Sequence, residues 1–272
     1  HMIAGSAAGV AEHCAVFPLD TIKTHLQSYK PKHGESFLHT TRAIVQSQGV
    51  TGLFRGVTAA ALGAIPAHAL HFASYEFCKH TLGANKTGHH PIAIATSGII
   101  SAIISEATMT PCDTIKQKLQ LNRYPSMGAC IRDTYREYGV VRGFYAGYTT
   151  ALVMNAPYIG IQFATYESLK TILAGEDKDE RKRTIHHLLA GAGGGAIAGA
   201  ATNPLDVSRT RLQTQTSEVA YKGMLNTLKK IHHEEGVRGL TRGMATRMAF
   251  HSLSSAVTWV TYESLKNFLN ER

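Results

Sequence analysis

The chain has 272 residues, of which 44% are hydrophobic and 17% charged, and its formal net charge is +9. Its four cysteines are scattered without paired spacing, so neither a disulfide framework nor a structural zinc site is indicated. The positive charge suits either nucleic acid or an anionic membrane. A basic rim on a membrane is the simpler interpretation, because Lys and Arg lie mostly between or at the ends of apolar stretches.

Six stretches are nearly free of charge. Each is roughly 20 residues long, near the length that a helix needs to span the ~30 Å hydrocarbon core of a bilayer. Small residues at four-residue spacing, such as Gly191, Gly195 and Gly199, allow close helix packing in lipid. A soluble helical solenoid is the alternative, but its repeats would be shorter and its helices would show a polar face. The stretches are Met2–Leu19, Gly56–Tyr75, Pro91–Cys112, Gly147–Tyr166, His187–Leu205 and Met248–Tyr262.

A short amphipathic segment follows the first, third and fifth stretches, so each repeat consists of a helix, a loop, a short helix and a second long helix. These segments are Phe37–Gln48, Met127–Tyr138 and Lys222–Glu235. We therefore expect one all-α membrane domain with six transmembrane helices in three pseudo-threefold repeats, and with both termini on one side. The repeats are 1–84, 91–174 and 185–272.

Two motifs recur in register along the chain, and they define the repeats. The first places a proline, an acid, a base and a glutamine at fixed offsets, and its prolines are 93 residues apart. These prolines should kink or break their helices. The second motif is Tyr-Glu-x-x-Lys. The first motif contains Pro18, Asp20, Lys23 and Gln27; Pro111, Asp113, Lys116 and Gln120; and Pro204, Asp206, Arg209 and Gln213. The second contains Tyr75, Glu76 and Lys79; Tyr166, Glu167 and Lys170; and Tyr262, Glu263 and Lys266.

Together with an aromatic-basic-glycine element (Phe54-Arg55-Gly56 in the first repeat), these motifs resemble the mitochondrial carrier family over the whole chain. The resemblance implies a funnel-shaped carrier of the inner mitochondrial membrane that exposes one central site alternately to each side. We expect a monomer with membrane lipids, cardiolipin among them, as its partners, and no nucleic acid. His25 departs from the family pattern, where the other repeats have Lys118 and Arg211.

An acid and a base three residues apart can pair within one helix, for only ~0.2–0.5 kcal/mol. Three copies around an axis allow a ring instead, in which each acid meets the base of another repeat. On the matrix side these pairs would be Asp20–Lys116, Asp113–Arg209 and Asp206–Lys23, with Gln27, Gln120 and Gln213 bonding across them. On the cytoplasmic side they would be Glu76–Lys170, Glu167–Lys266 and Glu263–Lys79, braced by Tyr75, Tyr166 and Tyr262. We expect both rings to act as gates, with weak pairs of about 0–1 kcal/mol that can open.

Substrate choice should lie where the threefold symmetry breaks, midway along the helices. The candidate contact residues there are His13, His68, Glu106, Met154, Asn155 and His251. Arg or Lys would be needed to hold a nucleotide or a multivalent anion, and none is expected at this depth, with Arg247 a turn away. Imidazoles, a thioether, an amide and one carboxylate suit a borderline divalent transition metal. Each histidine could instead be a packing residue, and Glu106 could couple protons or pair with Arg247.

Four segments resemble, more narrowly, the iron carriers of this family: Glu12–Pro18, Pro66–Leu70, Met154–Pro157 and Arg247–His251. That resemblance implies import of Fe²⁺ into the matrix as the transported substrate, with no resident cofactor. A carrier of S-adenosylmethionine or of an amino acid is the alternative. We do not expect an enzyme, because the sequence has no His-Glu-x-x-His, Gly-x-Ser-x-Gly or phosphate-loop motif.

Overall fold

The computed structural model describes residues 16–28, 36–83, 90–174, 180–216 and 221–270, with side-chain surroundings given except at 174–184 and 258–270. This part of the chain is helical and contains no β-strand. Residues 16–27 form the first described helix. The others are α2 (Phe37–Gln48), η1 (Val50–Phe54), α3 (Val57–Thr81), α4 (Pro91–Gln120), α5 (Met127–Phe144), α6 (Tyr148–Ala174), α7 (Glu180–Ala201), α8 (Asn203–Gln213), α9 (Met224–Leu240) and α10 (Met244–Asn270).

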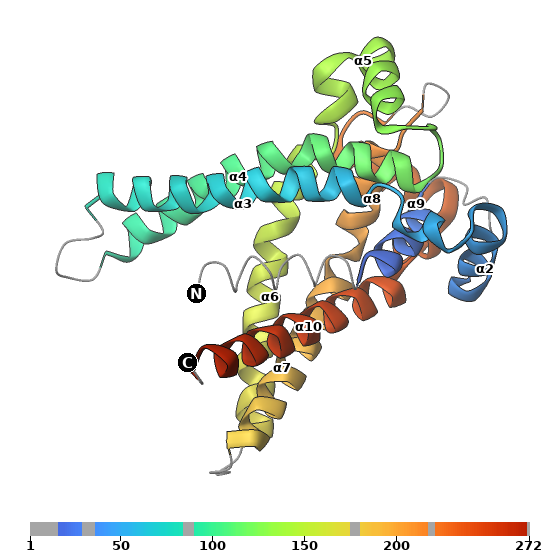
Figure 1. The fold of residues 1–272 in the computed structure, drawn as a ribbon. Helices are drawn as coiled ribbons and strands as arrows, with labels where there is room; N and C mark the ends of the chain where they lie inside the picture. Colours follow the sequence, from blue (N-terminus) through green and yellow to red (C-terminus); the bar gives the residue numbers. More distant parts are fainter. Residues whose placement is uncertain (1–15, 29–35, 84–89, 175–179, 217–220, 271–272) are drawn as a thin grey trace.

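The long helices converge at one end of the molecule and diverge toward the other (Figure 1). α3 packs along α4, while α7 packs along both α6 and α10. Residues 16–27, the end of α4 and α8 meet at what we call the convergent end, whereas the α3–α4 and α6–α7 pairs extend from it in different directions. The expected position of both termini on one side concerns residues outside the described ranges.

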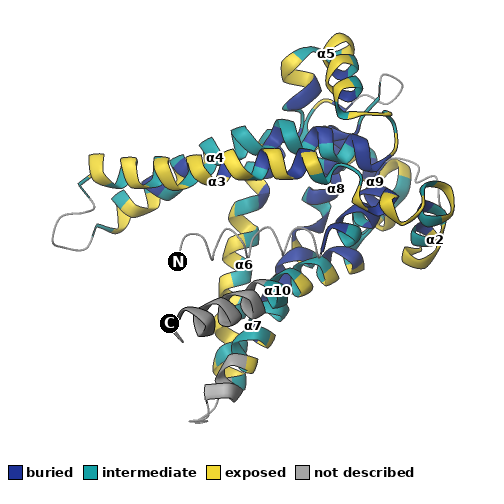
Figure 2. Ribbon diagram, viewed as in Figure 1, coloured by how far each residue is buried: buried dark blue, intermediate teal, exposed yellow. Residues whose placement is uncertain are grey.

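Burial follows the same division (Figure 2). Buried residues gather at the convergent end, whereas large apolar side chains such as Leu62, Phe72 and Ile92 are exposed along α3 and α4. Apolar surface on this scale marks contact with lipid or another apolar partner. Among the described residues, the helical stretches Val50–Thr81 and Pro91–Gln120 are long and apolar enough to cross a membrane. The other four expected spans stay predictions.

The amphipathic helices α2, α5 and α9 repeat the same local design. α2 ends at Gly49, whereas α5 and α9 are kinked at Gly139 and Gly236, and these glycines have positive φ angles of 71°, 69° and 65°. Residues with a Cβ rarely adopt this backbone conformation, so a glycine at each position lets the chain turn. Nine and five residues before each glycine stand the buried pairs Thr40 and Ile44, Cys130 and Thr134, and Thr227 and Ile231.

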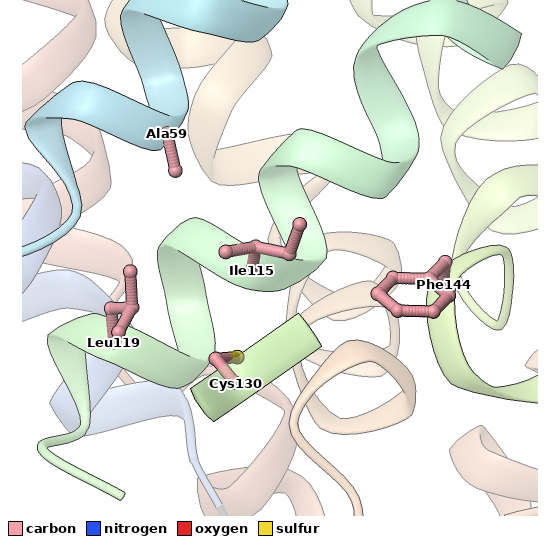
Figure 3. Packing of buried hydrophobic residues seen from close by; sticks show 5 residues of the cluster. All are labelled: Ala59, Ile115, Leu119, Cys130 and Phe144. Carbon is pink, nitrogen blue, oxygen red and sulfur yellow. The ribbon is translucent and has the colours of Figure 1, made fainter. Parts of the chain in front are cut away.

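Two equivalent hydrophobic clusters fasten these amphipathic helices to the convergent end. In the second repeat Ile115 and Leu119 of α4 pack with Ala59, Cys130 and Phe144 (Figure 3). In the first repeat Ile22 and Leu26, 93 positions earlier, pack with Ile44 and Leu53. Each cluster joins the helix that carries a proline motif to the amphipathic helix of the same repeat. This contact holds the charged residues of the motif in place.

The motif prolines act differently in different repeats. In the third repeat α7 ends at Ala201 and α8 begins at Asn203, so the expected interruption lies just before Pro204. In the second repeat α4 is one continuous helix through Pro111. The proline removes one backbone donor, and the Thr110 hydroxyl supplies another nearby by donating to the backbone oxygen of Glu106 at 2.7 Å.

Candidate substrate site and gate

The six charged residues of the proline motif form three ion pairs at the convergent end, and we call them the proline-motif ring. Each acid is paired with the base of another repeat, not with the base on its own helix. The nitrogen–oxygen distances are 2.8 Å for Lys116–Asp20, 2.8 Å for Lys23–Asp206 and 2.7 Å for Arg209–Asp113. The geometry is the expected inter-repeat pairing. Its role as a gate stays a prediction.

Glutamines brace two of these pairs as expected. The Gln120 amide donates to Asp20 at 2.8 Å, and the Gln27 amide donates to Asp206 at 2.9 Å. Threonines orient the two amides: Thr24 donates to the Gln120 oxygen at 2.8 Å, and Thr210 donates to the Gln27 oxygen at 3.0 Å. An amide held by its oxygen directs its N–H groups to the neighbouring carboxylate.

The third pair departs from the expected brace. Gln117 stands where the other repeats have Thr24 and Thr210, and its amide donates to the Gln213 oxygen at 2.7 Å. The Gln213 nitrogen is buried without a hydrogen-bond partner and does not bond to Asp113. The prediction for Gln213 is therefore wrong in this conformation. Gln117 holds the Gln213 oxygen as threonine does in the other repeats, but its side chain is longer and the Gln213 nitrogen is left without a partner.

Glu106 takes the place of the missing brace. Arg209 Nη2 lies 2.7 Å from Glu106 Oε1 as well as 2.7 Å from Asp113 Oδ2. The other oxygen of Glu106 accepts from the Asn155 amide at 3.4 Å. The partner of Glu106 is thus Arg209 and not Arg247, since Glu106 lies less than two helical turns before Asp113 and shares its face of α4. A candidate site residue is therefore tied directly to the ring.

Arg247 connects the centre of the molecule to the ring at a second place. Its guanidinium donates to the backbone oxygen and hydroxyl of Thr202 at 3.0 and 2.9 Å. The Met154 sulfur lies 3.6 Å from Nη2, and His251 Nε2 lies 3.5 Å from Nε. The carboxylate of Asp206 is 3.4 Å from Nη1. The expectation that no Arg or Lys reaches this depth is therefore wrong, because the Arg247 guanidinium contacts both Met154 and His251. Its spacing of four residues from His251 on one helix was the signal for this contact.

His251 is oriented from both sides of its ring. A guanidinium can only donate, so Nε2 accepts from Arg247 and Nδ1 carries the proton that it donates to Tyr158 Oη at 3.0 Å. The histidine also borders a cavity of about 520 Å³ between α6, α7 and α10, with Gln162 and Ser255 in its lining. A Cβ at Gly199 would lie 2.9 Å from the ring, so glycine leaves room for it.

The other candidate residues are less closely grouped. His13 lies outside the described residues, and His68 is exposed on α3. Within the described ranges no three His, Cys, Asp or Glu side chains gather closely enough to hold a metal ion. His187, outside the candidate set, lies within α7 with Nδ1 2.8 Å from Tyr166 Oη.

The acids and bases of the Tyr-Glu-x-x-Lys motifs, which we call the tyrosine-motif charges, pair differently. Lys79 lies 3.6 Å from Glu76, and Lys170 lies 3.5 Å from Glu167, each within one helix. The expected Glu76–Lys170 pair is therefore not formed, because α3 and α6 diverge toward these ends (Figure 1). The third copy of the motif (Tyr262, Glu263 and Lys266) lies on α10 with side chains outside the described set.

Comparison with known proteins agrees with this architecture. A family model described as mitochondrial carrier protein matches residues 1–86, 88–177 and 180–272. A mitoferrin from Dictyostelium discoideum is 47% identical over 100% of this chain and 94% of its own length. Human mitoferrin-2 is 35% identical over 100% of this chain and 78% of its own length. The mitochondrial RNA-splicing protein MRS3 of Saccharomyces cerevisiae is 36% identical over 98% and 88%. This chain therefore belongs to the mitochondrial carrier protein family, and it is a mitochondrial membrane protein with an all-α fold.

Proposed function

We propose that this carrier imports Fe²⁺ across the inner mitochondrial membrane into the matrix by alternating access. The proline-motif ring is the matrix gate, the tyrosine-motif charges form the cytoplasmic gate, and the substrate binds between them near Met154 and His251. The protein acts as a multi-pass monomer in lipid that includes cardiolipin, and it is not an enzyme.

The observation that carries the proposal is the opposite state of the two sets of charges. The proline-motif ring is paired between repeats at 2.7–2.8 Å, whereas the described tyrosine-motif charges are paired within single helices. An alternating-access carrier needs one closed and one open gate at a time. This arrangement supports a carrier that is open to the cytoplasmic side.

The donor atoms at the centre support a divalent metal as the substrate. A thioether and an imidazole nitrogen are soft and borderline ligands, as suit a transition metal such as Fe²⁺. The Tyr158 hydrogen bond keeps the proton of His251 on Nδ1, so Nε2, which here accepts from Arg247, carries the lone pair that a metal would use. Relatives named mitoferrin align with the full length of this chain, and this similarity also supports iron as the substrate.

The rival interpretation, a carrier of S-adenosylmethionine or of an amino acid, needs Glu106 to bind an organic cation. Arg209 already lies 2.7 Å from that carboxylate, and Asn155 contacts its other oxygen. A neutralised carboxylate attracts an ammonium or sulfonium group weakly, so the described contacts favour the metal.

Fe²⁺ uptake into liposomes that contain the purified carrier and a metal-quenched dye tests the proposal, with ascorbate keeping the iron reduced. We expect saturable uptake that falls severalfold in Met154→Leu and His251→Ala. Met127→Leu, on α5 against the hydrophobic cluster of Figure 3, and His39→Ala, exposed on α2, are the matched controls that should retain uptake. The iron proposal would be rejected if the protein transports S-adenosylmethionine but takes up Fe²⁺ no faster than empty liposomes do.

A further inference from the structure

The side chain of Arg247 occupies the place where the proposed substrate would bind. It is 2% exposed, and its N–H groups face both the Met154 sulfur and the Nε2 atom of His251. These are the same two lone pairs that a divalent cation would use. A guanidinium has five donors and no acceptor, so it satisfies these atoms as a positively charged substitute for the metal.

The metal and the guanidinium cannot both bind the lone pairs of Met154 and His251 at the same time. They compete for the same lone pairs, and their two positive charges would repel each other at this distance. A cation that binds Met154 and His251 must therefore displace Arg247. The neighbouring acceptor for the displaced side chain is Asp206, whose carboxylate already lies 3.4 Å from Nη1.

Asp206 is also the acid of one proline-motif pair, 2.8 Å from Lys23. We propose that Arg247 is a resident cation that occupies the substrate donors in the empty carrier, and that an arriving divalent cation displaces it onto Asp206 and loosens the Lys23–Asp206 pair. The inference rests on the proposed function. It adds to that function a specific residue that reports site occupancy to the gate.

A purely structural role for Arg247 makes a different prediction. Its bonds to Thr202 satisfy a backbone oxygen at the break between α7 and α8. If that were its whole contribution, removing the guanidinium would lower thermal stability and leave metal affinity unchanged in the folded fraction. A resident cation instead lowers apparent affinity, because the site is competent only while the guanidinium is away.

Two measurements test the inference. Fe²⁺ affinity is measured under anaerobic conditions from the thermal stabilisation of the carrier in detergent, and uptake kinetics are measured in liposomes. We expect Arg247→Gln to bind Fe²⁺ roughly tenfold more tightly, if the guanidinium holds the donors about nine-tenths of the time. Turnover should fall together with KM, because the displacement that loosens the gate is lost. Arg247→Lys, which keeps the charge, should stay closer to the wild type in both.

A second pair of variants keeps the inference testable if Arg247→Gln does not fold. Asp206→Asn removes the acceptor for the displaced guanidinium and should weaken Fe²⁺ binding roughly tenfold, one decade for about 1.4 kcal/mol. Asp20→Asn removes the equivalent acid of another repeat, which is paired with Lys116 instead, and should leave Fe²⁺ affinity near the wild type although transport falls in both.

The outcomes separate this inference from the proposed function. Unchanged or weaker binding by folded Arg247→Gln, or equal affinities of Asp206→Asn and Asp20→Asn, would overturn the inference if the wild type still binds and transports Fe²⁺. A wild-type protein that neither binds nor transports Fe²⁺ would overturn both.

Discussion

The proline motif forms an ion pair between the first and second repeats and another between the second and third. The two pairs differ in the residues that surround them. At the first, Lys116 meets Asp20 alone, and Gln120 braces the pair. At the second, Arg209 is shared between Asp113 and Glu106, and the amide of Gln213 does not reach the acid. The first interface contains only ring residues, while the second extends through Glu106 to Asn155, two of the candidate substrate-contact residues.

The difference shows how a threefold symmetric motif can coexist with an asymmetric set of candidate contact residues. Threefold repetition supplies three closing pairs of similar length. Single differences at equivalent positions, glutamine for threonine at Gln117 and a carboxylate at Glu106, then connect one pair to the candidate contact residues. Gating can thus depend on symmetric positions and recognition on the exceptions.

Exchanging the charges of the acid and the base should produce the largest difference between the two interfaces. Lys116→Glu alone sets two acids within about 4 Å, which costs on the order of 4 kcal/mol at an effective dielectric constant of ~20. We expect it to abolish Fe²⁺ uptake, and the double change Asp20→Lys with Lys116→Glu to restore most of it. Asp113→Arg with Arg209→Glu should fail to restore uptake, because the acid introduced at position 209 faces Glu106.

Adding Glu106→Gln to the second exchange is the control, because it removes the opposing carboxylate. Uptake should then return to the level of the first exchange. If the Asp113–Arg209 exchange is tolerated without this change, the shared carboxylate does not distinguish the two interfaces.

Removing Gln120 or Gln213 should give a smaller difference between the two interfaces. Gln120→Ala deletes a hydrogen bond to a charged group, worth about 1.5–3 kcal/mol, whereas Gln213→Ala deletes a neutral one, worth about 0.5–1.5 kcal/mol. Thermal unfolding in detergent, without substrate, should therefore show a larger loss of stability for Gln120→Ala. Equal losses would mean that the two glutamines brace the ring alike.

Replacing Gln117 by threonine should make the second interface resemble the first. The shorter hydroxyl would let the Gln213 amide turn toward Asp113, as the other two interfaces allow. We expect Gln117→Thr to stabilise the closed ring by about 1 kcal/mol, the net value of one added hydrogen bond, and to slow uptake. Thr24→Gln, the reverse change in the first repeat, should destabilise the ring, and a stabilising effect of Thr24→Gln would contradict this account.

The proline-motif pairs could be predicted from the sequence because fixed spacing on repeated helices determines which charges face one another. The detachment of Gln213 and the contact of Glu106 with Arg209 could not, because they depend on side-chain lengths at neighbouring positions. The contacts of Arg247 required knowing how α6, α8 and α10 approach one another. The pairing within helices at the tyrosine-motif charges depends on the conformation, which a sequence does not specify.

The smallest change in stability should come from the position two residues after the base of each proline motif. The three repeats carry His25, Lys118 and Arg211 there. In the third repeat the Arg211 guanidinium binds Glu235 on α9, which also lies 2.8 Å from Arg242. Burial acts to raise the pKa of Glu235, but its hydrogen bonds and attraction to Arg211, with help from Arg242, hold that pKa below the ordinary value of 4.5. A lowered folded-state pKa stabilises the protein above the unfolded value, and this contribution is lost as the pH falls through the folded pKa. Thermal unfolding should therefore show the wild type to be more stable than Glu235→Gln at neutral pH, and the difference should shrink below about pH 4.5, where the carboxylate begins to be protonated.

The equivalent residue of the second repeat, Lys118, provides the matched control, because its ammonium contacts the neutral Thr134 hydroxyl at 3.1 Å. Thr134→Val should give a loss of stability that does not change over the same acidic range, and a parallel pH profile for both variants would show that Glu235 does not carry the acid sensitivity.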